Sequence, residues 1–153
     1  MVQRYPEATP ELYLRDETAW LEATAELVRA GRLDLVDAAS LAEYLTDMAI
    51  RDRREVISRL TVLLQHLLKW HHQPDRRSGS WQATIYEQQD QLTDLLESGT
   101  LRNHAGEVLA KAYERAVRAA AAETQIPEST FPPACPYTVD QLLSADLLTG
   151  NGA

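Results

Sequence analysis

Three of the four histidines lie close together in the sequence, at His66, His71 and His72. With carboxylates from Glu43, Asp47 or Asp75, they could form a metal site or serve a hydrolytic reaction. Helical bundles build such sites from facing helices, typically with Glu-x-x-His pairs, and this sequence contains no such pair. On one helix, His66 and His71 would be about 140° apart, so they cannot easily bind the same ion. A metal-binding or hydrolytic enzyme is therefore an alternative hypothesis.

The competing interpretation of these histidines is structural. It places His71 on the apolar side of a helix near its end, His66 beside the core and His72 in solvent. No nucleophile or orienting partner is visible near them. The single cysteine, Cys135, has no adjacent cation, and the chain lacks a phosphate-binding glycine loop, a Gly-x-Ser-x-Gly motif and a dinucleotide fingerprint. We therefore predict a non-catalytic protein without a cofactor.

A basic turn after the histidines is the better candidate for a binding site. It combines cations, tryptophan rings and serines close to a predicted helix start, which offers free amide groups and the positive end of the helix dipole. Paired arginines can bind phosphate or carboxylate in bidentate fashion. In the competing interpretation, the arginines pair with acidic flanks and the tryptophans seal the core. The predicted site, called the basic corner below, consists of Lys69, Trp70, Arg76, Arg77, Ser80 and Trp81.

Charge is distributed unevenly along the 153 residues, which carry a formal net charge of −8. Residues 51–77 hold seven Lys/Arg and three Asp/Glu, whereas residues 1–50 and 78–153 each hold four and ten. An acidic protein is poorly suited to non-specific nucleic-acid binding, because neutralising phosphates requires basic surface. Neither a helix–turn–helix nor an aromatic platform is evident. A nucleic-acid-linked regulator is thus a weaker hypothesis, which would use Arg51, Arg53, Arg54 and Arg59 with Lys69, Arg76 and Arg77.

Helical patterns begin near the N-terminus. Thr9-Pro10 is typical of a helix start and Gly31 of a helix end. The next helix would be capped by Asp37, or by Ser40 within a Ser40–Glu43 capping box. The first of these helices carries two adjacent apolar lines that predict a broad buried face, Tyr13/Trp20/Leu27 and Leu14/Leu21/Val28.

The central and later segments are also helical in pattern. Apolar residues recur at helical spacing from Val56 to Trp70, and Pro74 would end this helix. Residues 51–55 contain neither glycine nor proline, so the helix either continues through them or breaks there. Ser80 would cap a following helix that ends at Gly99-Thr100. A last long helix would run to residue 123, with alanines that allow close helix packing.

The C-terminal part differs in composition from the rest. Four prolines between Ile126 and Tyr137 exclude regular helix, and the apolar residues among them predict an extended arm lying across the helices. Thr138 would cap a short helix through Leu143. We predict a single-domain, all-α, antiparallel bundle of about five helices spanning residues 1–153, with a helical core at 9–123 and an arm at 124–153.

The cellular compartment is also suggested by the sequence. The N-terminus has no apolar core of the signal-peptide type, and no apolar run is long enough to cross a bilayer. The lone cysteine fits a reducing compartment. These features predict a soluble, cytoplasmic protein without a membrane partner.

An ordered set of short motifs extends over nearly the whole chain. The motifs are Tyr13-x6-Trp20, His66-Leu-Leu-Lys-Trp70, Gln73-Pro74, Arg76-Arg-Ser78, Ser80-Trp81, Thr84-Ile85, Ala112-Tyr113 with Ala116, Glu123-Thr124, Phe131-Pro132 and Cys135-Pro136-Tyr137. Together they resemble the bacterial domain of unknown function family 29. The resemblance implies an all-α bundle and a cytoplasmic bacterial protein. It brings no reaction, cofactor or ligand with it.

The leading functional hypothesis is a non-catalytic interaction module. Its basic corner would contact a protein partner or a small anion. The charge distribution disfavours nucleic acid as the partner, and a homo-oligomer is compatible with the sequence.

Overall fold

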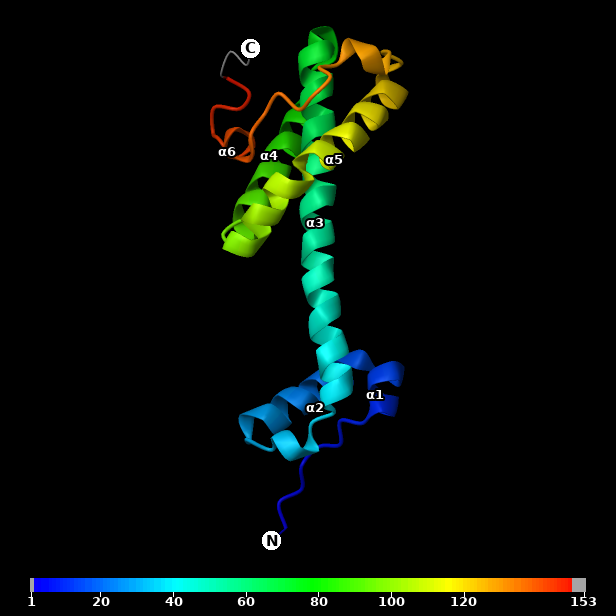
Figure 1. Ribbon diagram of the computed structural model, residues 1–153, viewed down its shortest axis with the longest axis vertical. Helices are drawn as coiled ribbons and strands as arrows, with labels where there is room; N and C mark the ends of the chain where they lie inside the picture. Colours follow the sequence, from blue (N-terminus) through cyan, green and yellow to red (C-terminus); the bar gives the residue numbers. More distant parts are fainter. Residues whose placement is uncertain (1, 150–153) are drawn as a thin grey trace. The chain divides into compact units, whose positions relative to one another are not determined.

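The computed structural model describes residues 2–149 (Figure 1). Within that range all regular structure is helical and no strand occurs, which confirms the predicted all-α class. Contacts divide the chain into two compact units, Met1–Ile50 and Arg51–Ala153. The organisation of the whole chain as one domain stays a prediction, and residues 150–153 of the predicted arm lie outside the described residues. None of the described helices is long and apolar enough to span a bilayer.

The first unit contains α1 (Pro10–Arg15), α2 (Glu17–Arg29), the short 3-10 helix η1 (Leu33–Leu35) and the start of α3 (Ala38–His72). Thr9 caps α1 as predicted, since its hydroxyl accepts from the Leu12 N–H at 3.2 Å. The single helix predicted up to Gly31 is wrong, because the chain breaks at Asp16. This residue has a non-helical backbone and caps α2 by accepting from the Ala19 N–H at 3.1 Å.

The break at Asp16 also explains the exposure of Leu14, one of two errors in the predicted buried face. Trp20 and Leu27 of the first apolar line are fully buried, as predicted. Leu14 and Val28 of the second line are 85% and 47% exposed, so this line is not buried as a whole. Because α1 and α2 are separate helices, residues on either side of Asp16 do not follow one helical register. At its other end α2 terminates as expected, with Gly31 in the left-handed region at φ 70°.

Aromatic rings form the centre of the first unit. The Trp20 indole packs against Tyr13 with ring centroids 4.7 Å apart, and against Tyr44 of α3 at 6.3 Å. Ala8 and Leu27 complete the buried cluster. The indole N–H of Trp20 is buried and finds no hydrogen-bond acceptor among the described residues.

Asp37 caps the start of the long helix α3, since its carboxylate accepts from the Ser40 N–H at 3.2 Å. Of the two predicted caps, Asp37 is therefore the one used, and Ser40 lies inside the helix. The charged segment 51–55 is helical throughout, with Glu55 and Arg59 paired at 2.8 Å along one side. Continuity through this segment leaves four long helices in residues 2–149 rather than about five. The helix ends at His72, before Pro74, as predicted.

The second unit combines the later turns of α3 with α4 (Gly79–Leu95) and α5 (Gly99–Thr124). Successive helices run in opposite directions and are joined by short connections (Figure 1). Ser78 caps α4, since its hydroxyl accepts from the Trp81 N–H at 3.3 Å, so the predicted cap at Ser80 is wrong by two residues. Gly99 does not end α4 but starts α5, which is capped by Ser98.

A single apolar cluster fills the second unit. Its largest fully buried side chains come mainly from α3 and α4, whereas α5 contributes mainly alanines, three of them at four-residue spacing, which permit close helix approach. The fully buried members include Val56, Leu60, Leu63, Leu64, Leu67, Ile85, Leu92, Ala105, Ala112, Ala116 and Ala120.

The C-terminal arm packs on these helices, as predicted. Phe131 is buried, and the Tyr113 hydroxyl donates to the Pro132 carbonyl at 2.6 Å. The arm contains the 3-10 helix η3 (Glu128–Thr130) and the short α6 (Val139–Leu142), where Thr138 forms the expected cap as part of a capping box. Gln89 of α4 donates to the Leu142 carbonyl at 2.9 Å, which ties α6 to the bundle.

Candidate functional site

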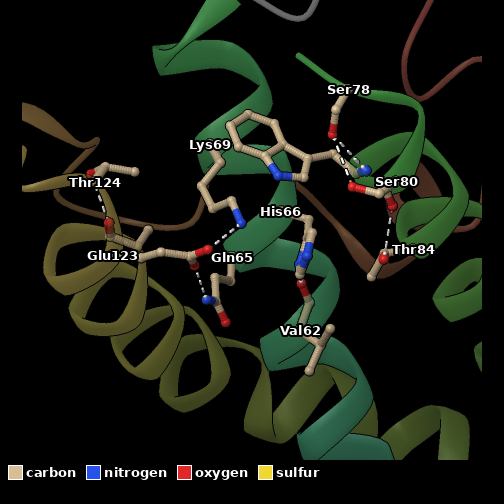
Figure 2. Close-up of polar contacts among 11 residues, drawn as sticks. Val62, Gln65, His66, Lys69, Ser78, Ser80, Thr84, Glu123 and Thr124 are labelled. Carbon is tan, nitrogen blue, oxygen red and sulfur yellow. Dashed lines mark hydrogen bonds and ion pairs between the residues drawn. The ribbon is translucent and has the colours of Figure 1, made fainter. Parts of the chain in front are cut away.

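The lysine of the basic corner is buried and internally paired. Lys69 is 3% exposed, and its ammonium donates to the Glu123 carboxylate of α5 at 2.8 Å. The same carboxylate accepts from the Gln65 amide at 2.8 Å (Figure 2). The Lys69 nitrogen also lies 4.5 Å from the centre of the Trp81 ring of α4, a cation–π distance. One buried cation thus links α3, α4 and α5.

Arg77 is exposed but held in place by the end of α3. Its Nε donates to the Trp70 carbonyl at 2.8 Å, and the guanidinium carbon lies 4.8 Å from the centre of the Trp70 ring. The bond satisfies a carbonyl of the last helical turn, which the helix itself cannot satisfy. Arg76 is also exposed and forms no ion pair among residues 2–149.

The serines at the start of α4 serve the helix end. Besides capping the helix, the Ser78 hydroxyl lies 3.0 Å from the Ser80 hydroxyl. The Ser80 carbonyl accepts from the Thr84 hydroxyl at 3.0 Å, one turn further on. The predicted corner therefore contains two distinct pairs: a buried cation, Lys69, with Trp81, and an exposed cation, Arg77, with Trp70.

The histidines occupy three different environments. His66 is half-buried, with Nδ1 2.9 Å from the Val62 carbonyl of the preceding turn. His72 is half-buried against Phe131 at 4.8 Å, whereas His71 is exposed, so the environments predicted for these two neighbours are wrong. Although the surface of His71 is exposed, neighbouring protein atoms still partly desolvate its ring, and this desolvation, followed by the nearby charges of Arg77 and His72, lowers the pKa of His71.

The structure does not assemble the predicted metal ligands. Glu43 belongs to the first unit and the three histidines to the second. No group of three or more His, Cys, Asp or Glu side chains suited to a metal ion occurs in the described part of the chain. Cys135 donates to the Tyr137 carbonyl at 3.4 Å, and burial raises the pKa of its thiol, which disfavours the reactive thiolate.

The central arginines divide into two groups. Arg59 bonds to Glu55 at 2.8 Å and to the Gln88 amide oxygen of α4 at 3.3 Å, so it serves the packing of helices. Arg51, Arg53 and Arg54 are exposed and form no ion pairs within residues 2–149.

Sequence patterns did not identify the carboxylate that pairs with Lys69. Lys69 follows the apolar residues Leu67 and Leu68 in α3, which indicates that its ammonium is buried. A buried cation needs a negatively charged partner. Glu123 is 54 positions away, on α5, and only the packing of α3 against α5 brings the two charges together.

These observations define an all-α protein whose second unit has an apolar core and an ion pair between the buried Lys69 of α3 and the half-exposed Glu123 of α5. The chain belongs to the family described as "Domain of unknown function DUF29", whose model matches residues 12–148. The predicted family resemblance is thereby confirmed. No curated protein and no solved structure matches the chain.

We predict that the Lys69–Glu123 pair makes stability depend on acidic pH. The hydrogen bond from Lys69, reinforced by that from Gln65, outweighs partial burial and lowers the pKa of Glu123 below its ordinary value of 4.5. A carboxylate whose pKa is lower in the folded state stabilises that state above the unfolded pKa. This contribution disappears as the pH falls through the folded pKa. Stability should therefore decline as the pH drops below about 4.5, and Glu123→Gln should show less of this decline.

The measurement is urea denaturation of both proteins at a series of pH values between about 6 and about 3. Glu123 is half-exposed, so the difference between the two profiles is expected to be modest. Parallel profiles for the two proteins would show that the pair contributes nothing to the acid sensitivity.

Proposed function

We propose that this protein is a non-catalytic interaction module and that its basic corner binds an anionic group on a protein partner. One observation carries the proposal: the exposed Arg77 guanidinium is positioned over the Trp70 ring by its bond to the Trp70 carbonyl. A planar cation fixed in this way loses little conformational freedom when it binds a carboxylate or phosphate. Arg76 lies beside it without an ion pair in residues 2–149.

Two further features support this proposal. The corner lies at the start of the 17-residue helix α4, where the backbone amides of the first turn and the helix dipole favour an anion. Trp70 and Trp81 are only partly buried, and the Trp70 ring lies against the exposed Arg77 guanidinium. Tryptophan next to arginine is a frequent combination in protein interfaces.

The proposal assigns different tasks to the residues of the corner. Arg76 and Arg77 contact the partner, and Trp70 supports Arg77 from below. Lys69 and Trp81 hold the corner together through their contact and the bond to Glu123. The cytoplasm is the proposed location, consistent with a single, half-buried cysteine.

The test compares Arg76→Ala/Arg77→Ala with the unchanged protein in two measurements. In the first, inorganic phosphate is titrated while the amide signals of Gly79, Ser80 and Trp81 are followed by NMR. In the second, each protein is used as bait for affinity capture from cell extract. We expect the wild type to show saturable shifts and to retain specific proteins, and the double variant to lose both.

The matched control is Arg115→Ala/Arg118→Ala, which removes two exposed arginines from α5 instead. This variant should behave like the wild type in both measurements. If the double variant at Arg76 and Arg77 gives the same shifts and captures the same proteins as the wild type, the basic corner has only a structural role.

A further inference from the structure

A groove with a volume of about 640 Å³ lies between α5 and the C-terminal arm, wholly within the second unit. It is lined on one side by α5 and on the other by the arm between Glu128 and Pro133. Both sides are fixed in place, because Phe131 is buried in the core and the Tyr113 hydroxyl donates to the Pro132 carbonyl at 2.6 Å. Clefts of roughly 300–1,000 Å³ are typical of small-molecule binding sites. The lining residues of α5 are Tyr113, Glu114, Val117 and Arg118.

The more deeply buried part of this lining is apolar. Tyr113 and Phe131 are each 3% exposed, and Val117, Pro132 and Pro133 also line the groove. The two prolines have no N–H, so this part of the arm presents apolar surface without a donor that a ligand must satisfy. The Tyr113 hydroxyl stays protonated at neutral pH, because burial raises its pKa to about 12. The groove therefore suits an uncharged, apolar portion of a ligand.

Charged side chains of both signs line the same groove. Glu114 and Arg118 come from α5 and Glu128 from the arm, and all three are exposed. None of them forms an ion pair among residues 2–149, although Glu114 and Arg118 have the four-residue spacing that favours such pairs in a helix. Opposite charges that remain apart in one groove are complementary to a ligand that carries both charges itself.

We propose that this groove binds a short peptide of two or three residues with free termini and apolar side chains. The peptide carboxylate pairs with Arg118, whose guanidinium can bind both carboxylate oxygens, and the ammonium pairs with Glu128 on the arm. The peptide side chains lie against Val117 and the two prolines. A single amino acid leaves much of the volume empty, whereas a short peptide has the size that such clefts enclose. None of these residues belongs to the basic corner, so this site is independent of the function proposed above.

The first experiment titrates the dipeptide L-leucyl-L-phenylalanine into the whole protein and follows its binding by NMR. The signals observed are the methyl groups of Val117 and the backbone amides of Ser129 and Phe131. We expect these signals to shift saturably, with a dissociation constant of about 1 mM or lower. Free L-phenylalanine should bind at least about tenfold more weakly, because it fills only part of the groove. An absence of saturable shifts, or an equal affinity for the free amino acid, would overturn the proposed ligand.

Capped forms of the dipeptide test the role of its two charges. N-acetylation removes the ammonium and C-terminal amidation removes the carboxylate, while the apolar side chains stay the same. Because each cap removes one charge-assisted contact, we expect each to weaken binding about tenfold. If both capped peptides bind as tightly as the free dipeptide, the groove recognises apolar surface alone and the proposed charge pairing is wrong.

Substitutions in the groove assign each terminus of the peptide to one residue. Arg118→Gln should weaken binding of the free dipeptide about tenfold but leave the affinity for the amidated peptide unchanged, because that peptide already lacks the contact. Glu128→Gln should have the corresponding effect, with the acetylated peptide as the one whose affinity is unchanged. Since each variant still binds one capped peptide normally, this pattern cannot arise from misfolding.

The matched control is Arg115→Gln, which changes an exposed arginine of α5 that is not among the lining residues of the groove. This variant should bind the free dipeptide like the wild type. Equal losses of affinity in Arg115→Gln and Arg118→Gln would show that the overall charge of the helix, rather than a contact in the groove, governs binding, and the proposed site would be wrong.

Discussion

Glu123→Ala is expected to lower the free energy of unfolding by about 2–3 kcal/mol, although Glu123 itself is half-exposed. This loss of stability comes from Lys69, the other member of the ion pair. Lys69 is 3% exposed, and without the carboxylate its ammonium would stay enclosed between α3 and α4 with only the Trp81 ring as a neighbour for its charge. Removing one partner of a buried pair leaves an uncompensated charge, which costs more than the pair contributes. Chemical denaturation of the two proteins at neutral pH measures the difference.

Lys69→Met is the informative comparison. Methionine retains an unbranched side chain for the buried space but carries no charge, while the half-exposed Glu123 can be solvated by water. We expect this change to cost less than about 1 kcal/mol. The double variant Lys69→Met/Glu123→Ala should then be more stable than Glu123→Ala alone. If the two single changes cost the same and their effects add, the buried ammonium is not what makes the loss of Glu123 costly.

The sequence predicted the buried side of α3 well. The recurrence of Val56, Leu60, Leu63 and Leu67 at helical spacing matches four fully buried residues. This pattern is local, because apolar residues about one turn apart lie on the same face of the helix and pack against the same neighbouring surface. The ends of the helices at Thr9, Gly31 and Pro74 were predictable for a related reason. Each depends on backbone chemistry within a few residues.

Contacts made by distant segments were not predictable in this way. The environment of His72 depends on the position of Phe131, which reaches His72 only because the arm folds back over the helices. In the same way, the sequence pattern did not indicate that Lys69 pairs with Glu123, because the two residues meet only where α5 packs against α3. Helical periodicity assigns a residue to a face but does not say which later segment covers that face.

The basic corner shows what this limit means for a predicted site. Its arginines and serines were predicted from residue type and from closeness in sequence. The packing of the helices gives some residues of the corner a structural role and leaves others exposed at the surface. Lys69 is used inside the protein, whereas Arg77 is anchored at the surface by Trp70. The cap moved from Ser80 to Ser78 because Gly79 already has helical geometry, a difference of two residues that residue types alone do not settle.

Trp20→Ala is expected to destabilise the first unit by about 3–5 kcal/mol, the larger of the two effects argued here. Trp20 is fully buried and packs on both Tyr13 and Tyr44, so truncation leaves a large cavity between α1, α2 and α3. The first unit has few other buried hydrophobic residues with which to fill the space. Native-state hydrogen exchange of the α2 amides measures the loss directly, since these amides become accessible when the unit opens.

Trp20→Phe separates the packing of the ring from its polar group. The buried indole N–H has no acceptor among the described residues, so phenylalanine removes a donor whose desolvation is uncompensated. That gain partly offsets the packing lost with the smaller ring. We expect the free energy of unfolding to fall by no more than about 2 kcal/mol. If phenylalanine costs as much as alanine, the N–H is bonded in solution, and the aromatic cluster depends on that bond rather than on ring packing.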